Sequence, residues 1–120
     1  MTIMNVDDSS TMRRIVTMSL APSGHQVVEA ENGADALAKL KASPADAVVL
    51  DINMPVMNGL ELLKAMRADP ALKRIPVVML TTQGEEETRN EAIGLGANGF
   101  LAKPFQKEEL LAVLKKVAGI

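Results

Sequence analysis

Residues 47–50 form an unbroken run of apolar side chains that ends in a single carboxylate, Asp51. Turn-forming residues lie on both sides of this run. An apolar run of this length between turn signals is typical of a strand that is buried on both faces, as in a parallel sheet. A second uninterrupted run, residues 75–80, ends in Thr81. The two runs therefore favour a parallel sheet, with Asp51 at the point where a buried strand reaches the surface.

Strand and helix patterns alternate along the rest of the chain. Short apolar stretches predict strands at residues 2–6, 26–30, 47–51, 75–80 and 99–102. Apolar residues at helical spacing predict helices at residues 10–20, 34–42, 59–67, 85–95 and 107–118. Five strand–helix units of this kind indicate an α/β fold, a doubly wound parallel five-stranded sheet with helices on both faces. With 120 residues, the chain is expected to form one domain.

Composition narrows the class of protein further. The chain has no cysteine, which excludes disulfides and thiolate metal sites. A net charge of -2 and the scarcity of aromatic residues argue against direct nucleic-acid binding, which needs a basic surface. No apolar run approaches the roughly 18 residues of a membrane span, and two acidic residues precede any signal-peptide hydrophobic segment. We therefore expect a soluble, cytoplasmic protein without membrane contact.

Polar side chains follow four of the five predicted strands. They are Asp7, Asp8, Asp51, Thr81 and Lys103. Because the carboxyl ends of parallel strands lie at one edge of a sheet, we expect these side chains to meet at the edge where ligands bind in open α/β sheets. Each residue taken alone also has an ordinary explanation, as a helix cap, a strand end or a solvated lysine. Four strands ending in this way favour a common site.

The chemistry of such a cluster points to phosphate. Carboxylates this close repel each other, and one takes up a proton unless a cation is present. Hard oxygen ligands without His or Cys suit Mg²⁺, and a carboxylate beside Mg²⁺ can attack phosphorus to give an aspartyl-phosphate. Lys103 and Thr81 are placed to bind the phosphoryl oxygens. The chain has no phosphate-cradling glycine loop, so we do not expect it to hold a nucleotide.

At these residues the sequence resembles the receiver domain of two-component response regulators, and most of all the CheY-like single-domain members. The matching stretches are residues 6–9 (VDDS), 51–59 (DINMPVMNG), Thr81 after an apolar strand, and 103–105 (KPF). The resemblance covers residues 1–120 as one receiver domain. It implies a (βα)5 flavodoxin-like fold with strand order 2-1-3-4-5.

The resemblance also implies a role for each site residue. Asp51 would accept the phosphoryl group, with Thr81 and Lys103 assisting. Asp8 and Asp51 would bind Mg²⁺ directly, Asp7 through water and Asn53 through its backbone carbonyl, and the bond from Lys103 to the following proline would be cis.

Thr81 and Phe100 would form the switch that the resemblance implies. The phosphoryl oxygens would draw Thr81 inward, and Phe100 would fill the vacated space and alter the face formed by residues 85–118. Many family members have Tyr at this position, and Phe100 lacks the hydroxyl that Tyr offers to a partner. Plain core packing is the alternative for Phe100. Asn5 is also unusual, because a buried Asn in the first strand needs hydrogen-bond partners.

The implied function is a signalling switch in a two-component phosphorelay, with chemotaxis as one candidate pathway. The chain would take its phosphoryl group from a sensor histidine kinase or a small donor such as acetyl phosphate. It would catalyse only its own phosphorylation and dephosphorylation, and would act as a monomer by contact with a downstream protein, such as a flagellar switch or a phosphotransferase. Two alternatives stay open: a phosphate-independent pseudo-receiver, and a Mg²⁺-dependent phosphatase that uses an aspartyl-phosphate. Against the phosphatase, Asn53 stands where haloacid-dehalogenase-like enzymes have their second Asp.

Overall fold

The computed structural model describes residues 1–52, 54, 56–81 and 86–119. Strands and helices alternate from the N-terminus, as the sequence pattern predicts. The strands are β1 (Thr2–Val6), β2 (Gln26–Ala30), β3 (Ala47–Asp51), β4 (Val77–Thr81) and β5 (Gly99–Ala102). The helices are α1 (Ser10–Leu20), a short 3-10 turn η1 (Ala21–Ser23), α2 (Gly33–Ala42), α3 (Gly59–Ala68), α4 (Glu86–Gly94) and α5 (Lys107–Ala118).

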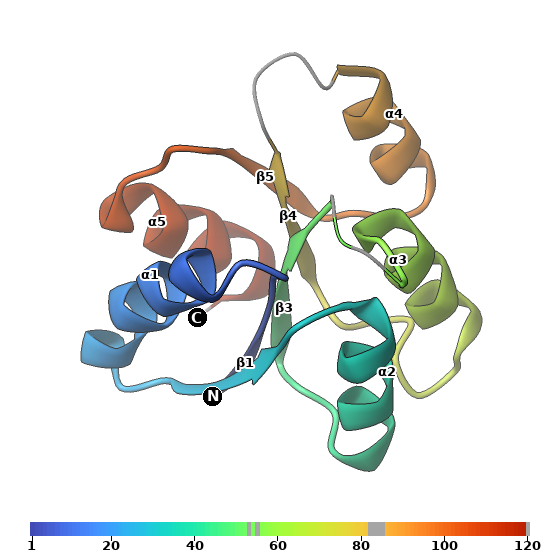
Figure 1. Cartoon of the computed structure of the whole chain (residues 1–120), viewed down its shortest axis with the longest axis horizontal. Helices are drawn as coiled ribbons and strands as arrows, with labels where there is room; N and C mark the ends of the chain where they lie inside the picture. The colour runs from blue at the N-terminus through green and yellow to red at the C-terminus, as the bar shows by residue number, and fades with distance from the viewer. Residues whose placement is uncertain (53, 55, 82–85, 120) are drawn as a thin grey trace.

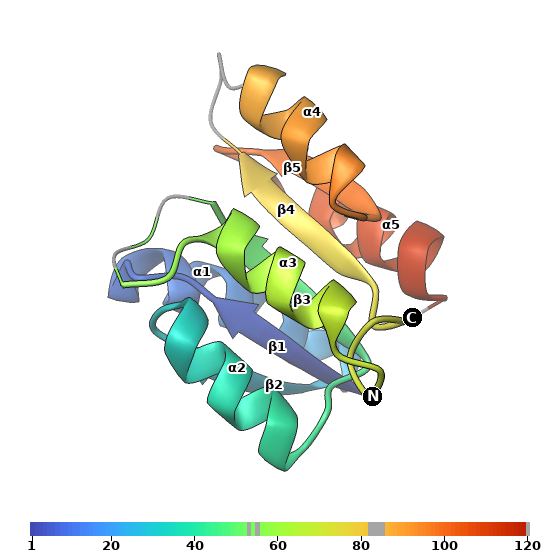
Figure 2. The ribbon, with the colours of Figure 1, turned by 90° about the vertical axis from the view of Figure 1, so that its right-hand side faces the viewer.

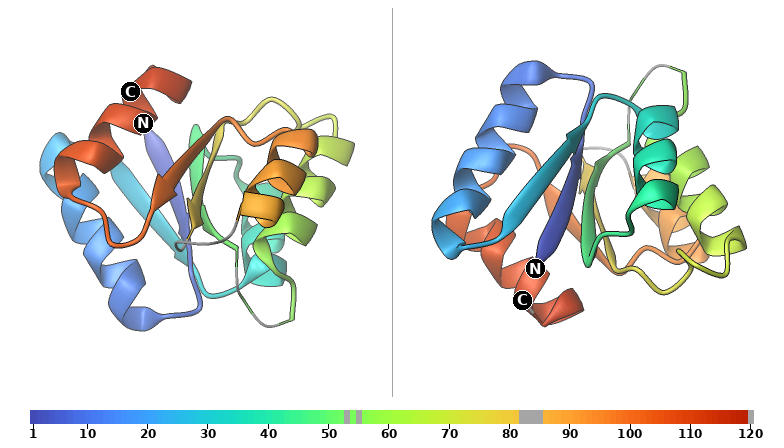
Figure 3. Two further views of the ribbon diagram at one scale, coloured as in Figure 1. Left: turned by 90° about the horizontal axis from the view of Figure 1, so that it is seen from above. Right: turned by 90° about the horizontal axis from the view of Figure 1, so that it is seen from below.

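The five strands form one parallel sheet in the order β2-β1-β3-β4-β5. This order confirms the flavodoxin-like topology. The helices α1 and α5 cover one face of the sheet, and α2, α3 and α4 cover the other (Figures 1 and 2). Figure 3 shows the sheet between these two helical layers from both ends of the molecule. All strands run in the same direction, so their carboxyl ends share one edge.

Two hydrophobic layers hold the sheet in place. β3 and β4 are buried along their whole lengths. Alternate side chains of β3 enter opposite layers, with Val48 and Leu50 toward α2 and α3, and Ala47 and Val49 toward α1 and α5. Apolar runs rather than alternating patterns are therefore required in these two strands. Among the described residues, no helix is long and apolar enough to cross a membrane.

Several element boundaries differ from the sequence prediction by one or two residues, and two of these differences have a clear local reason. β4 begins at Val77 rather than at residue 75. The N–H of Ile75 donates to Leu72 in a turn (3.1 Å), and Pro76 has no N–H to give to the sheet. The helix predicted from residue 34 begins one residue earlier, at Gly33, because the side chain of Asn32 accepts a hydrogen bond from the N–H of Asp35 (2.8 Å) and caps the helix.

The start of α3 fixes the loop that follows β3. Asn58 and Glu61 form a capping box, with distances of 2.9 Å from the Glu61 N–H to Asn58 Oδ1 and 3.1 Å from the Asn58 N–H to Glu61 Oε1. Gly59 donates its N–H to the carbonyl of Ile52 (2.9 Å), and a Cβ at this position would meet the carbonyl oxygen of Asp51. Glycine is required at position 59 because the backbone approaches the end of β3 so closely.

Candidate functional site

Three carboxylates meet at the carboxyl edge of the sheet. Asp7 and Asp8 follow β1, and Asp51 is the last residue of β3, the strand beside it. Each offers one oxygen, and these oxygens all lie within 4.8 Å of one another. Asp7 is 1% exposed and Asp51 5% exposed, whereas Asp8 is open to solvent. The predicted convergence of the three acids is therefore observed.

Lys103 reaches this cluster from the segment after β5. Its Nζ lies 2.8 Å from Asp51 Oδ1 and 3.6 Å from Asp7 Oδ2. Its backbone N–H donates to the carbonyl of Thr81 (2.7 Å), and the peptide bond to Pro104 is cis, as expected. Burial by itself lowers the pKa of Lys103, but the contacts with Asp51 and Asp7 outweigh it and hold that pKa above its usual value. Lys103 is thus a fixed cation at the carboxylates.

The charge of the cluster is not balanced by Lys103 alone. Burial raises the pKa of Asp51, and the charge of Asp8 raises it further. The contact with Lys103 lowers that pKa but does not cancel the rise, so the pKa of Asp51 lies above its usual value. Burial also raises the pKa of Asp7, whose Oδ1 accepts the N–H of Ser9 (2.9 Å). Within the described part of the chain, Asp7 Oδ2 has no hydrogen-bond donor. A buried acceptor without a donor, among hard oxygen ligands, fits a divalent cation.

Of the three remaining predicted site residues, Thr81 lies at the same edge of the sheet as the acids, whereas Phe100 does not contact them. Thr81 ends β4 at the same edge and is buried. Phe100 lies in β5, opposite Met79 of β4, and packs against the core layer beneath α2, α3 and α4 rather than against the acids. Arg89 of α4 stacks on its ring, with Cζ 4.9 Å from the ring centroid. The predicted ligand Asn53 lies outside the described residues.

One residue beside the site was not found from the sequence. Arg13, in the second turn of α1, donates from Nη1 to the backbone carbonyl of Asp7 (2.6 Å). The only sequence signal was indirect: Asn5 is an amide in an otherwise apolar strand and needs partners. The structure supplies partners on α1 for the amide nitrogen, where Asn5 Nδ2 donates to the carbonyl of Arg13 (2.8 Å) and to the hydroxyl of Thr17 (3.1 Å). Asn5 Oδ1 has no hydrogen-bond partner among the described residues.

Comparison with known proteins identifies the family. Residues 3–115 match the model of the response regulator receiver domain. This chain belongs to that family. The receiver domain is 46% identical over 122 residues to chemotaxis protein CheY1 of Helicobacter pylori, covering 99% of this chain and 98% of the relative. It is 46% identical over 118 residues to chemotaxis protein CheY-3 of Vibrio cholerae, covering 98% and 91%.

Solved structures agree with the sequence relatives. The receiver domain superposes on the chemotaxis response regulator CheY4 of Vibrio cholerae with a TM-score of 0.91 and 40% identity, covering 97% of both chains. It superposes on the receiver domain of NtrX from Brucella abortus with a TM-score of 0.91 and 32% identity, covering 98% of both. Because the alignments span nearly the whole of the CheY relatives, the chain is a CheY-like receiver domain.

Family membership gives the acidic cluster its meaning. Asp7, Asp8 and Asp51 are the acidic triad that serves phosphoryl acceptance in receiver domains, and the triad is consistent with the divalent-cation site typical of them. Receiver domains are signalling proteins rather than classical enzymes. The family therefore argues against the phosphatase that the sequence left open.

Proposed function

We propose that residues 1–120 form one receiver domain that accepts a phosphoryl group on Asp51 from a sensor histidine kinase. One observation carries the proposal: Asp51 ends a buried strand 2.8 Å from Lys103 Nζ, and its carboxylate lies within 4.8 Å of those of Asp7 and Asp8. A carboxylate oxygen of Asp51 attacks phosphorus, and the bond from phosphorus to the donor's imidazole nitrogen breaks. The domain catalyses only this transfer and the later hydrolysis of its own aspartyl-phosphate.

The chain's other residues prepare this step. Asp8 and Asp51 would hold Mg²⁺ directly, Asp7 through water and Asn53 through its carbonyl. When bound, Mg²⁺ supplies the positive charge that lets an anionic phosphoryl group approach three carboxylates. Lys103 Nζ is already fixed at Asp51 and pairs with the phosphoryl oxygens as negative charge moves onto them.

The proposed output is a change in the face formed by α4, β5 and α5. The Thr81 hydroxyl donates to the new phosphoryl oxygens, and Phe100 takes a new position on β5 in response. The stacking of Arg89 on Phe100 supports this coupling, because it joins the ring directly to α4. Both curated relatives above are named chemotaxis proteins, so we assign this chain to chemotaxis signalling in the cytoplasm. There it acts as a monomer on a downstream protein, such as a flagellar switch, a phosphotransferase or another target.

Acetyl phosphate labelling tests the acceptor. With Mg²⁺, mass spectrometry of the intact protein should show one added phosphoryl group, and the Asp51→Asn variant should show none. Asp46→Asn is the matched control, because Asp46 lies at the opposite edge of the sheet and Asn retains an oxygen for the N–H of Thr2 (2.7 Å). Equal labelling of the Asp51→Asn variant and the parent protein would refute the proposal.

A second experiment tests the signalling role. Partners are captured on the immobilised protein with and without beryllofluoride and Mg²⁺, which together mimic the aspartyl-phosphate. At least one partner should bind differently in the presence of the mimic. Indifference of every bound partner would instead support a pseudo-receiver, and turnover of a small phosphate ester would support a phosphatase.

A further inference from the structure

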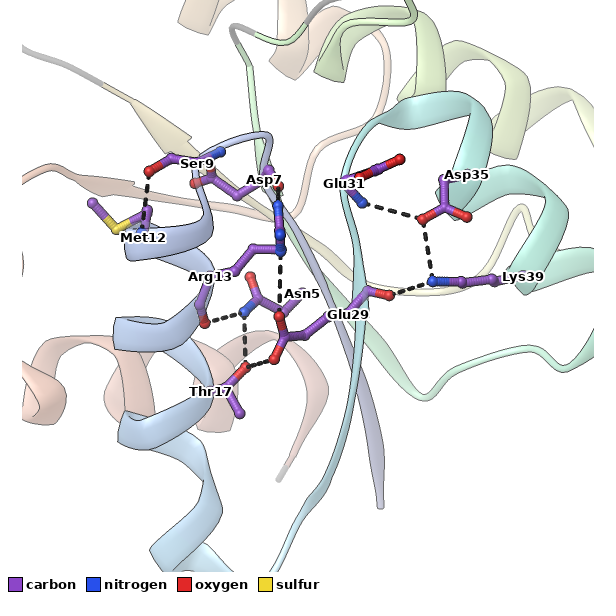
Figure 4. A network of polar contacts seen from close by, with 10 residues as sticks. All are labelled: Asn5, Asp7, Ser9, Met12, Arg13, Thr17, Glu29, Glu31, Asp35 and Lys39. Atoms are coloured by element: carbon purple, nitrogen blue, oxygen red, sulfur yellow. Dashed lines mark hydrogen bonds and ion pairs between the residues drawn. The ribbon is translucent and has the colours of Figure 1, made fainter.

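A chain of polar contacts runs from the buried centre of β1 to the loop that carries Asp7 (Figure 4). It begins at Asn5, which is fully buried and lies two residues before Asp7 in sequence. Asn5 Nδ2 donates to the carbonyl of Arg13 (2.8 Å) and to Thr17 Oγ1 (3.1 Å). These bonds fasten the middle of α1 to the sheet directly below the acidic triad. A buried amide there is costly unless it is paired, so its role needs an explanation.

Arg13 occupies the centre of this network. Its Nη1 donates to the carbonyl of Asp7 (2.6 Å), and its Nε pairs with Glu29 Oε1 (3.2 Å). The other carboxylate oxygen of Glu29 accepts the hydroxyl of Thr17 (3.1 Å). The Arg13 side chain is 18% exposed, so its guanidinium is largely shielded from water. The carbonyl of Asp7, just after β1, and the carboxylate of Glu29 in β2 thus hold a planar guanidinium in one orientation.

The Asp7 backbone is held on both sides by this arrangement. Its N–H donates to the carbonyl of Ala30 at the end of β2 (3.1 Å), and its carbonyl accepts Arg13. Lys39 of α2 steadies the same end of β2 by donating to the carbonyl of Glu29 (2.7 Å). The carbonyl of Asp7 and the N–H of Asp8 belong to one planar peptide unit. The orientation that Arg13 gives this unit therefore constrains the backbone from which both side chains extend.

We propose that Arg13 is a positioning residue for the cation site. Its side chain fixes the Asp7–Asp8 peptide and is itself held by Glu29, which Thr17 braces, while Asn5 holds the backbone carbonyl of Arg13. The inference rests on the proposed function, since it assumes that Asp7 and Asp8 hold Mg²⁺. Arg13 does not contact the carboxylates of the triad; it acts through the backbone that carries two of them. Partners that orient metal ligands in this way commonly change metal affinity by about 10–100-fold when they are removed.

The test compares Arg13→Gln with Arg14→Gln, a matched change at the exposed arginine next to it. The chain has no Trp or Tyr, so Mg²⁺ affinity is measured by NMR titration of backbone amides rather than by intrinsic fluorescence. Arg13→Gln should weaken Mg²⁺ binding about tenfold, and Arg14→Gln should leave it within about twofold of the parent. In metal-free protein, Arg13→Gln should also shift the amide nitrogen of Asp8, because the carbonyl of the same peptide loses its donor.

Two further variants keep the test decisive if Arg13→Gln folds poorly. Arg13→Lys retains the charge but lacks the fork that spans Glu29 and the Asp7 carbonyl, and Glu29→Gln loosens Arg13 without changing it; both should weaken Mg²⁺ binding. A merely structural role would lower the thermal midpoint and leave the Mg²⁺ affinity unchanged in all three variants, which would overturn the inference alone. Failure of the parent protein to bind Mg²⁺ would instead overturn the proposed function, and the inference with it.

Discussion

Among the residues that the structure describes, Lys103 is the one cation whose side chain contacts the carboxylates of the buried acids Asp7 and Asp51. The balance between its charge and theirs decides how stable the site is without metal. Its Nζ faces Asp51 at 2.8 Å and Asp7 at 3.6 Å, so one positive charge stands against three carboxylates. Removing a charged group from such a cluster raises or lowers the stability of the fold, depending on whether the group is negative or positive. A lost carboxylate relieves repulsion, and a lost ammonium leaves buried negative charge without a partner.

The Asp7→Asn variant should be more stable than the parent at pH 7 in the absence of metal. Burial raises the pKa of Asp7 above its ordinary value of 3.8, and Asp51 adds to the rise. A folded-state pKa above the unfolded one means that the native state binds more protons, so stability falls as pH rises through that interval. Asn has no proton to lose, so urea unfolding in EDTA should show a gain at pH 7 that disappears near pH 3. A gain of equal size at both values would contradict this account.

The Lys103→Met variant should be less stable than the parent protein, because it leaves the buried carboxylates of Asp51 and Asp7 without a cation beside them. Both partners are largely buried, and Met keeps much of the side-chain volume. We expect the free energy of unfolding at pH 7 without metal to fall by about 2 kcal/mol. In the Asp51→Asn background, Lys103→Met should lower the free energy of unfolding by clearly less, because the carboxylate that Lys103 pairs with is already absent. A double-mutant cycle by urea unfolding measures the difference, and strict additivity would show that the pair is not coupled.

At the scale of elements, the proposed acceptor Asp51 is positioned by the way β3 passes into α3. β3 is buried throughout, and the capping box of Asn58 and Glu61 fixes the first turn of α3. Gly59 lies against the carbonyl of Asp51. A Cβ placed on Gly59 would also lie only 2.9 Å from Cα of Ile52. These are backbone atoms at the end of a central strand, and they cannot move aside as a flexible side chain could.

Gly59→Ala should therefore destabilise the domain by about 2 kcal/mol and slow phosphorylation by acetyl phosphate, because the end of β3 must shift. The matched control is Gly94→Ala at the end of α4, where a Cβ would meet nothing within 4 Å. That change should be neutral or should stabilise the helix slightly. Urea unfolding and labelling rates compare the two variants, and equal behaviour would show that contact with Asp51 does not matter.

At the scale of the whole molecule, the sheet separates two helical layers, and the acidic triad lies at the edge they share. Phe100 and Arg89 belong to the layer of α2, α3 and α4, whereas Lys103 follows β5 on the way to α5. A change at the acids can therefore reach α4 through β4 and β5. The stacking of Arg89 on Phe100 holds the ring in place.

Arg89→Ala should move the resting equilibrium toward the beryllofluoride-bound state. A cation–π contact is worth about 0.5–1 kcal/mol at an exposed site, which corresponds to roughly a two- to fivefold change in population. Amide chemical shifts of β5, with the free and beryllofluoride-bound parent as end points, report that population. Arg74→Ala on the exposed loop before β4 serves as the control. Unchanged β5 shifts in Arg89→Ala would show that the stacking has no part in the switch.

The fold and most of the site could be predicted from the sequence, because both depend on the order of strands and helices along the chain and on the spacing of apolar residues within them. Parallel strands bring Asp7, Asp51 and Lys103 to one edge wherever the helices lie. The place of Arg13 could not be predicted in this way, because its bond to the Asp7 carbonyl depends on how α1 sits on the sheet. The start of β4 was also placed too early, since hydropathy does not register that Ile75 donates its N–H to a turn.

The central place of β3 in the sheet has a consequence for evolution. Its neighbours β1 and β4 shield it on both sides, and its side chains contribute to both hydrophobic layers. Surface residues of α1, α4 and α5 can accordingly be exchanged without rebuilding the strand that bears the proposed acceptor. One chemical centre can thus be retained while the helical surfaces around it diverge to fit different binding partners.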